Sequence, residues 1–379
     1  MIQQQTSVLS DAERLSWLQL IRSENVGAIT FHRLLSHYAS ASLALEALPE
    51  LAQRGGKRAI RVCPRRQAEA EMDGLAQIGG NLLACVEAPY PPSLASLEDA
   101  PPLLATLGHT HLLTRPAIAM VGARNASLNG RKLAHRFAKD LSDAGYLVVS
   151  GLARGIDRAC HEGSLAQATA GVMAGGVDVI YPPQNKDIYA KIKDQGLLLS
   201  EIQLAVEPQA RHFPRRNRII SGLASGTLVV EAALRSGSLI TARLANEQGR
   251  EVFAIPGSPL DPRARGGNSL LKQGATLVEQ PDDVLSVLAD FTLPAREPDR
   301  APFDGPSINP SDPSLAEARR LLSDLLGPTP LALDDLQRHT QLPPALLSFL
   351  LLELELAGRL ERHSGNRLSL LSDLEDVDA

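Results

Sequence analysis

Four arginines and one phenylalanine occur within eight residues of this chain, in the stretch RHFPRRNR at 211–218, and no carboxylate interrupts them. A planar guanidinium matches the oxygens of a phosphate, and an exposed Phe213 would stack a nucleobase for about 1–3 kcal/mol. Because the formal net charge of the chain is −5, any site for a polyanion has to be local. The stretch therefore predicts contact with a single nucleic-acid strand. The alternative is that Phe213 is core and that the arginines pair with carboxylates, but the window itself offers none.

The stretch MVGARNAS at 120–127 is a second candidate for binding phosphate. It follows an apolar run, Gly122 allows close backbone approach, and Ser127 can cap the helix that begins there, whose N-terminus attracts anions. The GxGxxG fingerprint is absent, no acidic residue closes the next apolar run, and GxxxxGK[ST] does not occur. Arg124 therefore projects from a glycine turn suited to a phosphate without a nucleotide pocket, and we expect no cofactor.

The stretch SGTLVVEAALRSGSLITA at 225–242 allows two interpretations. Gly226, Thr227 and Glu231 resemble the GGxGTxxE loop of nucleotide phosphoribohydrolases, in which the glutamate assists N-glycosidic cleavage. Glu231 lies one residue too late for that pattern, however, and the paired glycines are missing. In the second interpretation, Gly237 and Ser238 begin a helix, with Ser238 as its cap, and offer N–H groups to phosphate.

Asp157 and His161 are four residues apart in GLARGIDRACHEGSL and would share one helix face. Such a pair could ligate a metal or transfer protons, but no third ligand is evident. We favour a structural hydrogen bond and expect no metal site. Cys63, Cys85 and Cys160 are isolated, without CxxC spacing, which fits a reducing cytoplasm. The first residues lack the pattern of a secretory signal, and the apolar run at 346–352 is too short to span a bilayer.

Six short apolar runs alternate with helical stretches in the middle of the chain, which predicts a parallel sheet with helices on both faces. We interpret residues 79–293 as one Rossmann-like α/β domain, in which ligands bind beyond the carboxyl ends of the strands. With 379 residues, the chain is long enough for more than one core. The six runs lie at 117–124, 146–151, 171–176, 197–201, 227–232 and 251–257.

Two smaller domains are expected on either side of this α/β core. Residues 1–78 have helical periodicity, and ENVGAITFHRLL within them resembles a helix-hairpin-helix or SAM-like unit, for which a structural role is favoured because few basic residues lie near its turn. Residues 294–312 are rich in Pro, Asp and Ser and read as a linker. Residues 313–372 give three helices and a hairpin, the order of a winged helix.

The helix predicted at 343–358 of this winged helix would be the one to enter a DNA groove. It carries Glu353 and Glu355 and no cation, and residues 312–379 hold six arginines against twelve acidic residues. A groove-binding helix needs cations to offset phosphate repulsion. We therefore expect this domain to avoid DNA and to serve a protein partner or dimer support.

Six motifs in order, VGAR, SGLARGID, FPRRNRIISGL, EAALRSGSLITA, GREVFAIPG and GGNSLLKQGATLV, resemble the DNA-processing protein A family, called DprA or Smf. Ala123 stands where serine is common, and Cys160 replaces a usual alanine. The resemblance implies a cytoplasmic, homodimeric, non-catalytic protein that binds and protects incoming single-stranded DNA and helps load the RecA recombinase during natural transformation. By motif, it implies that the DNA-binding residues are Gly122, Arg124, Phe213, Arg216, Asn217, Arg218, Gly237 and Ser238.

Overall fold

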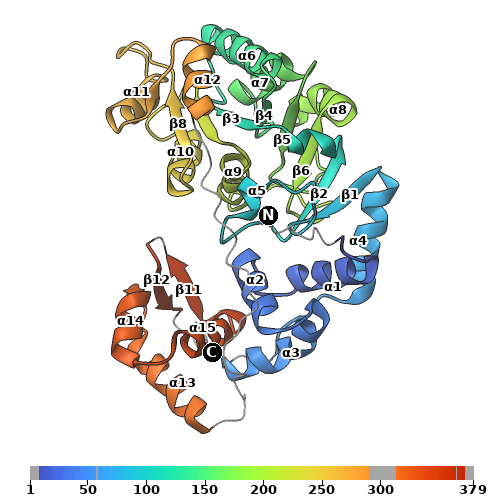
Figure 1. The fold of residues 1–379 in the computed structure, drawn as a ribbon, viewed down its shortest axis with the longest axis vertical. Coiled ribbons are helices and arrows are strands. Elements are labelled where there is room, and N and C mark those ends of the chain that lie inside the picture. The colour runs from blue at the N-terminus through green and yellow to red at the C-terminus, as the bar shows by residue number, and fades with distance from the viewer. Residues whose placement is uncertain (1–7, 57–58, 291–312, 364, 372–379) are drawn as a thin grey trace, which may run out of the picture. The chain divides into compact units, whose positions relative to one another are not determined.

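The computed structural model describes residues 8–56, 59–290, 313–363 and 365–371, and its contacts divide the chain into two compact units (Figure 1). The large unit holds the described residues of 69–298 together with residues 8–9. The small unit combines residues 10–68 with the described part of 299–379, so segments from opposite ends of the sequence fold together. The linker predicted at 294–312 lies outside the described residues.

A nine-stranded mixed sheet forms the centre of the large unit in the described residues, with strand order β1-β2-β6-β5-β4-β3-β7-β8-β9. All six predicted strands are present, and they pair in parallel. The strands are β1 (Gly80–Ala84), β2 (Leu103–Gly108), β3 (Ala117–Val121), β4 (Leu147–Ser150), β5 (Thr169–Val172), β6 (Leu197–Ser200), β7 (Gly226–Val229), β8 (Glu251–Ala254) and β9 (Thr276–Leu277).

Two further strands, which the sequence analysis did not identify, extend the predicted parallel core at one edge, where the pairing is antiparallel. Strands β1 and β2 pair antiparallel with each other, and β2 pairs antiparallel with β6. Their sequences, GNLLA and LLATLG, flank a proline-rich passage that reads as a spacer. A proline-rich segment does not indicate strands, because proline cannot donate to the hydrogen-bond ladder. The sequence analysis therefore did not identify the two strands beside it.

Helices cover both faces of the sheet, as predicted (Figure 1). α6 and α7 pack together on one face, and α9 and α10 pack together on the other. The helices of the large unit are α4 (Arg65–Gln77), which begins in the small unit, α5 (Pro92–Ala95), α6 (Leu128–Asp143), α7 (Ile156–Ser164), α8 (Lys186–Gln195), α9 (His212–Leu223), α10 (Ser238–Glu247), α11 (Arg265–Lys272) and α12 (Pro281–Asp290), with 3-10 turns η1 (Thr110–Thr114) and η2 (Pro183–Asn185).

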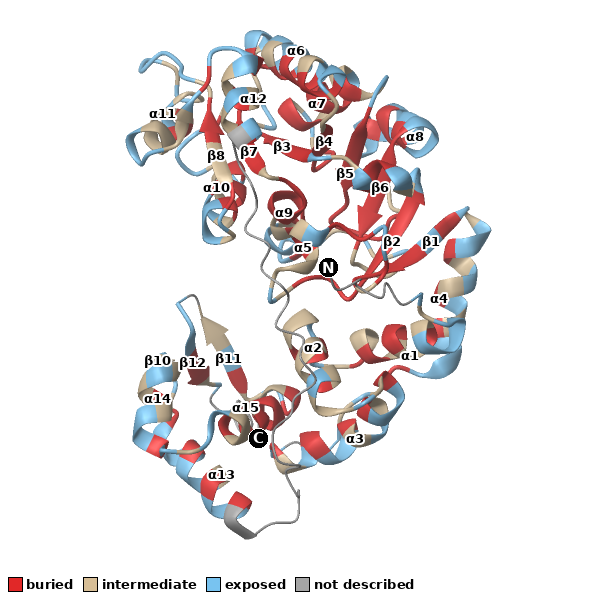
Figure 2. Ribbon diagram, in the orientation of Figure 1, coloured by how far each residue is buried: buried red, intermediate tan, exposed pale blue. Residues whose placement is uncertain are grey.

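The core between α6, α7, α12 and the sheet is mostly aliphatic, as the low aromatic content predicts, and Figure 2 shows the central strands as buried. Cys160 belongs to this core, and all three cysteines are buried. The aromatic rings in it are Phe137 and Phe253, and Phe253 leaves room only for glycine at position 226, where a Cβ would lie 2.5 Å from its ring. Among the described helices, none combines the length and the apolar character that crossing a bilayer requires.

The order of the strands places a switch point between β3 and β7. After β3 the chain builds β4, β5 and β6 on one side, and then returns to place β7 and β8 on the other. The parallel register pairs Val121 with Val229, so the loops that follow β3 and β7 leave the same edge of the sheet. In open α/β sheets, the crevice at such a point is where ligands bind.

The small unit combines residues 10–68 with the described part of 299–379, two regions that the sequence analysis assigned to separate domains. Its N-terminal helices are α1 (Asp11–Arg22), α2 (Ala28–His37) and α3 (Ala41–Arg54), and Leu15 and Leu18 of α1 are buried. Its C-terminal part has the predicted order of three helices and a hairpin, and its described strands form a sheet of order β10-β12-β11. These elements are α13 (Pro313–Leu325), β10 (Leu331–Ala332), α14 (Leu333–Thr340), α15 (Pro344–Leu356), β11 (Leu360–His363) and β12 (Arg367–Leu370).

Helix α15, the candidate groove-reading helix, packs inside the small unit against α2 and α3. The side chain of Asn25 donates to the carbonyl of Leu356 at 2.9 Å, and the rings of His37 and Phe349 lie 5.5 Å apart. A Cβ added to Gly55 would lie 2.0 Å from the carbonyl oxygen of Glu353, so the backbones of α3 and α15 meet there. The N-terminal helices thus cover α15.

The sequence interpretation treated the two glutamates of α15 as exposed charges, but the structure shows that they are buried or paired. Glu353 is 1% exposed, and both of its carboxylate oxygens accept from Arg319, at 2.7 and 2.9 Å. Glu355 forms an ion pair with Arg362. It forms a second ion pair, at 3.5 Å, with Arg33, which belongs to the N-terminal helices. In the described residues, α15 therefore packs against helices of its own chain, and arginines pair with both of its glutamates.

Candidate nucleic-acid interface

The turn after β3 is fixed by close backbone contacts. A Cβ added to Gly122 would lie 2.6 Å from Cγ1 of Ile156, so a larger residue cannot take this position without a shift. The N–H of Ala123 donates to the carbonyl of Glu231 at 2.7 Å, and its own carbonyl accepts from Ile156 at 3.2 Å. These bonds connect the loops after β3, β4 and β7 and leave the side chain of Arg124 exposed at the sheet edge.

A groove of about 700 Å³ opens at this edge, between the turn after β3, the first turns of α9 and the start of α10. We call it the main groove. Arg235 adds a further cation to its lining, and Asp157 is its carboxylate. The structure brings together here seven of the eight residues predicted to bind DNA: Gly122, Arg124, Phe213, Arg216, Asn217, Gly237 and Ser238.

Phe213 is a wall of the main groove and not a core residue, which decides against the alternative considered for it. Its side chain is half-buried, with the guanidinium carbon of Arg124 5.0 Å from the ring centroid and that of Arg216 5.9 Å from it. The ring of Tyr181 lies 6.0 Å away. Phe213 also lines a cavity of about 260 Å³, the side cavity, which Tyr181 and Met173 help to enclose.

Arg216 is the most unusual charge of the groove, because it is 6% exposed. A Cβ added to Gly151 would lie 1.5 Å from its Nη1, so the guanidinium fills the space that the glycine leaves. Among the described residues, Arg216 has no ion-pair partner within 4.0 Å, and its Nε has no hydrogen-bond acceptor. Burial lowers the pKa of Arg216 to about 10, against the opposing effect of Asp157, and the group stays protonated at neutral pH.

His161 makes a structural hydrogen bond onto the sheet, of the kind favoured from the sequence, whereas Asp157 also lines the main groove. His161 is fully buried, its Nδ1 shares a hydrogen bond of 2.7 Å with Thr169 Oγ1, and burial lowers its pKa to about 3. Asp157 accepts from the N–H of Ala153 at 3.3 Å. Burial raises the pKa of Asp157, while Arg216 lowers it. In the part of the chain that the structure describes, no cluster of three or more His, Cys, Asp or Glu residues is arranged to hold a metal.

Arg218 does not belong to the main groove. It lies two residues after Arg216 on α9 and points elsewhere, where it forms ion pairs with Glu201 and with Asp99 at 3.5 Å. The argument that no carboxylate is available fails for this arginine, because both partners lie outside the 211–218 window. As a predicted DNA contact, Arg218 is therefore corrected to a residue that anchors α9.

One other detail of the prediction changes, at Ser238. Ser238 is not the cap of α10, because Gly237 occupies the N-cap position and Ser238 is the first helical residue. Its hydroxyl is 2.7 Å from that of Ser236, which also accepts from the N–H of Ser238. The side chain of Asn217 donates to the carbonyl of Gly237 at 3.4 Å and so ties α9 to the start of α10.

The cap predicted at the other helix is confirmed, and it involves Glu231. Ser127 Oγ accepts from the N–H of Gly130 at 2.9 Å. Glu231 in turn accepts from the N–H of Ser127 at 2.9 Å and bonds to its hydroxyl. A carboxylate at a helix N-terminus is stabilised by the helix dipole, so Glu231 supports the first turn of α6.

Sequence reasoning missed Gly151, Arg154, Tyr181 and Arg235, which also line the main groove or the side cavity. Arg154 and Arg235 follow predicted strands, so their position at strand ends was a usable signal, but they lie outside the arginine-dense window. Tyr181 belongs to a loop that brings a second ring beside Phe213, and nothing in the local pattern shows that contact.

These features together define a Rossmann-like domain with an arginine-lined groove at its switch point. Such a groove is suited to a polyanion that has aromatic bases as well as phosphates. The family model for DNA recombination-mediator protein A matches residues 81–289, a model for a DprA-like N-terminal HHH domain matches 11–74, and one for a DprA winged helix domain matches 306–366. The chain belongs to the DNA recombination-mediator protein A family, DprA or Smf.

Individual relatives agree with this assignment. Protein Smf of Escherichia coli strain K12 is 43% identical over 228 residues, which cover 59% of this chain and 61% of that protein, and DNA processing protein DprA of Bacillus subtilis strain 168 is 41% identical over 58% and 75%. The alignment thus spans about three fifths of the Escherichia coli protein.

Two solved structures are also similar. DprA of Streptococcus pneumoniae matches with a TM-score of 0.60 and 33% identity over 76% of this chain and all of that one. A structure of DprA from Helicobacter pylori, described by its single-stranded DNA binding mode, matches with a TM-score of 0.52 and 29% identity over 57% of this chain and 99% of that one.

Proposed function

We propose that the main groove binds one strand of DNA, holding its phosphates with arginines and stacking a base on Phe213. The observation that carries this proposal is Arg216, a cation 6% exposed and without an ion-pair partner among the described residues. Asp157 offsets the burial of this charge only in part, because the pKa of Arg216 stays lowered, and a buried charge without a direct partner is costly. A phosphate in the groove would supply that charge.

A single strand fits this groove better than a duplex does. The lining offers a half-buried phenylalanine with a tyrosine beside it, which can take an unstacked base. In a duplex, the bases are already stacked on each other. A ring face stacks on any base, so we expect little sequence preference. The Helicobacter pylori relative supports this choice.

We propose further that the protein acts by binding and not by catalysis. The alternative function, nucleotide phosphoribohydrolase, needs Glu231 to reach a glycosidic bond. Both oxygens of Glu231 are engaged at the first turn of α6. Incubation with nucleoside monophosphates, followed by chromatography for free base, tests this point. Base release that Glu231→Gln abolishes would contradict the binding role.

The wider role follows from family membership and is also a proposal. We infer a cytoplasmic homodimer that protects incoming single-stranded DNA and helps load RecA recombinase during natural transformation. Light scattering should give twice the chain mass. On single-stranded DNA coated with a single-strand-binding protein, the wild-type protein should raise the rate of ATP hydrolysis by RecA. The Arg216→Ala variant should give less stimulation at the same concentration. Equal stimulation by both proteins would separate the RecA role from the groove.

Binding itself is tested by fluorescence anisotropy with a labelled oligothymidine of about 16 nucleotides, as a single strand and as a duplex. We expect the single strand to bind at least about tenfold more tightly, a difference of about 1.4 kcal/mol. Phe213→Ala should weaken the single-strand complex by the stacking free energy, about 1–3 kcal/mol. A duplex that binds as tightly as the single strand would refute the proposal.

A further inference from the structure

A second basic groove adjoins the main groove on the large unit. It has two connected parts, of about 630 and 490 Å³, which we call together the outer groove. The first part lies between the loop after β3, the loop after β4 and the η2 turn, and the second runs along α6 and α7. The predicted DNA-binding residues include only Arg124 from its lining.

The two grooves are continuous through the residues that they share. Arg124 lines the main groove, the side cavity and the first part of the outer groove. Arg154 lines the side cavity and that same first part. Arg131 and Arg158 then line both parts of the outer groove, and Lys132 lines the second. A nucleic-acid strand that extends from Phe213 into the outer groove would therefore contact cations along one connected path.

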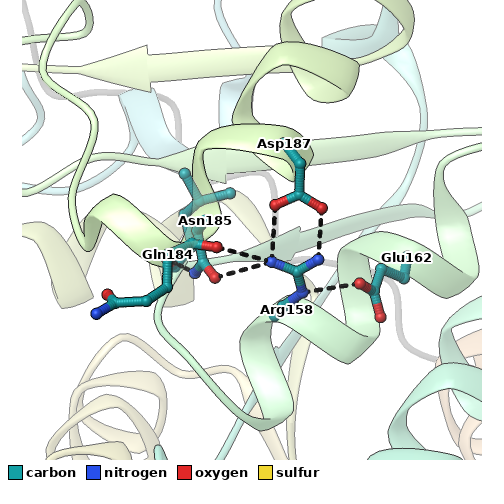
Figure 3. Close-up of polar contacts among 6 residues, drawn as sticks. Arg158, Glu162, Gln184, Asn185 and Asp187 are labelled. Atoms are coloured by element: carbon teal, nitrogen blue, oxygen red, sulfur yellow. Dashed lines mark hydrogen bonds and ion pairs between the residues drawn. The ribbon is translucent and has the colours of Figure 1, made fainter.

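Arg158 lines both parts of the outer groove, and Figure 3 shows its polar contacts. Its guanidinium donates two hydrogen bonds to Asp187, at 2.9 and 2.6 Å, and one to Glu162 at 2.8 Å. It also donates to the carbonyl of Gln184 at 3.1 Å, which ties the η2 turn to α7. Because two carboxylates already neutralise Arg158, its role in the path is to hold the walls in place.

Arg131, Lys132 and Arg154 differ from Arg158, because all three are exposed and none has an ion-pair partner in the described parts of the chain. The first part of the outer groove has four arginines in its lining and no carboxylate, and the second part adds Glu162. Neither part has a Phe, Tyr or Trp side chain in its described lining. The outer groove is thus suited to the phosphates of a strand and not to its bases.

We propose that a DNA strand bound at Phe213 continues into the outer groove, where Arg131 and Lys132 contact its backbone. This inference rests on the proposed function of the main groove. It extends that function, because the DNA-binding site would then include the outer groove as well as the main groove beside the 211–218 stretch. The chemistry is sequence-independent, since only charge is offered. Affinity should therefore increase with strand length beyond the few nucleotides that the main groove holds.

The test compares a short and a long oligothymidine, of about 4 and about 16 nucleotides, on the full chain. The variant is Arg131→Ala with Lys132→Ala. The matched control is Arg136→Ala with Lys139→Ala, which removes the same charge from the same helix. Arg136 and Lys139 pair with Asp140 and Asp143, at 3.6 and 2.6 Å, and line neither groove.

With the long strand, we expect the variant to lose about tenfold in affinity and its salt slope to fall by about 1.4, which is 0.7 for each of two phosphates. The short strand should bind the variant as tightly as the wild type, and the control should match the wild type with both strands. A variant that keeps long-strand affinity, loses both strands equally, or loses only duplex binding would overturn the inference. Failure of the wild type to bind either strand would instead refute the proposed function.

Discussion

Gly151 and Arg216 occupy complementary space: a Cβ built on the glycine would lie 1.5 Å from Nη1 of the arginine. The loop after β4 therefore decides where the buried cation of α9 can lie. The added methyl group of Gly151→Ala would displace the guanidinium of Arg216. The aliphatic part of the Arg216 side chain can change its conformation to allow this. We expect oligothymidine affinity to fall about tenfold, or about 1.4 kcal/mol, with the fold retained. Anisotropy and thermal unfolding measure the two effects.

The control for this substitution is Gly327→Ala in the small unit, where an added Cβ meets nothing within 4 Å. It should change neither affinity nor the melting temperature beyond a degree or so. If Gly151→Ala bound DNA as well as the wild type, the position of Arg216 would not matter for binding.

Asp157 places a negative charge in the lining of the main groove, where it opposes phosphate. Asp157→Asn keeps an oxygen that can accept from the N–H of Ala153 and removes the charge. We expect oligothymidine affinity at pH 7 to rise several-fold, because phosphate no longer meets a carboxylate. Titration calorimetry would check this. A weaker complex would show that Asp157 is needed to hold Arg216 and that this outweighs its repulsion.

His161 should make stability depend on pH. Its folded pKa of about 3 is below the ordinary 6.5, because burial disfavours the charged form. The stability that comes from the neutral ring is therefore present above pH 6.5 and is lost as the pH falls from 6.5 toward 3. Between pH 7 and pH 5 we expect a loss of about 2 kcal/mol from this residue. Urea denaturation at both pH values measures it.

The comparison for this prediction is His161→Gln, which cannot take up the proton. Its free energy of unfolding should fall less between pH 7 and pH 5 than that of the wild type, whatever its value at pH 7. The same pH dependence in both proteins would place the acid sensitivity in other groups.

Arg319 and Glu353 form an ion pair in the small unit, in which the carboxylate is buried. Arg319→Ala would leave a carboxylate 1% exposed without its bidentate partner, which typically costs about 3–5 kcal/mol. We expect the small unit to unfold at lower denaturant concentration, while oligothymidine affinity stays within a few-fold. Unfolding followed by Trp17 fluorescence reports on this unit, because Trp17 belongs to α1. A hundredfold loss of affinity would mean that the small unit grips the strand.

The sequence predicted those parts of the fold whose signals are local. The six central strands are short apolar runs, and the capping serine at 127 stands next to its helix. The dense local charge of the 211–218 stretch likewise pointed to Arg216, which the structure places in the lining of the main groove. The sequence did not reveal the ion pairs of Arg218, because Glu201 and Asp99 lie outside the 211–218 stretch, 17 and 119 residues from Arg218 along the chain.

The packing of α15 shows the same limit. Glu353 and Glu355 look like surface charges in a sequence, since a single stretch of residues does not show what will cover it. Arg319 and Arg33, which meet them, belong to α13 and α2. Burial of the helix depends on contacts between the two ends of the chain, and periodicity within either end carries no information about that contact.

The salt dependence of oligothymidine binding, measured for Arg216→Ala and Arg218→Ala, tests the central claim most directly. Both variants remove one arginine from α9, but only Arg216 lines the main groove. We predict that Arg216→Ala weakens binding and lowers the salt slope by about 0.7, whereas Arg218→Ala loses stability and keeps the wild-type slope. An unchanged slope for Arg216→Ala, or the larger drop for Arg218→Ala, would contradict a strand bound in this groove.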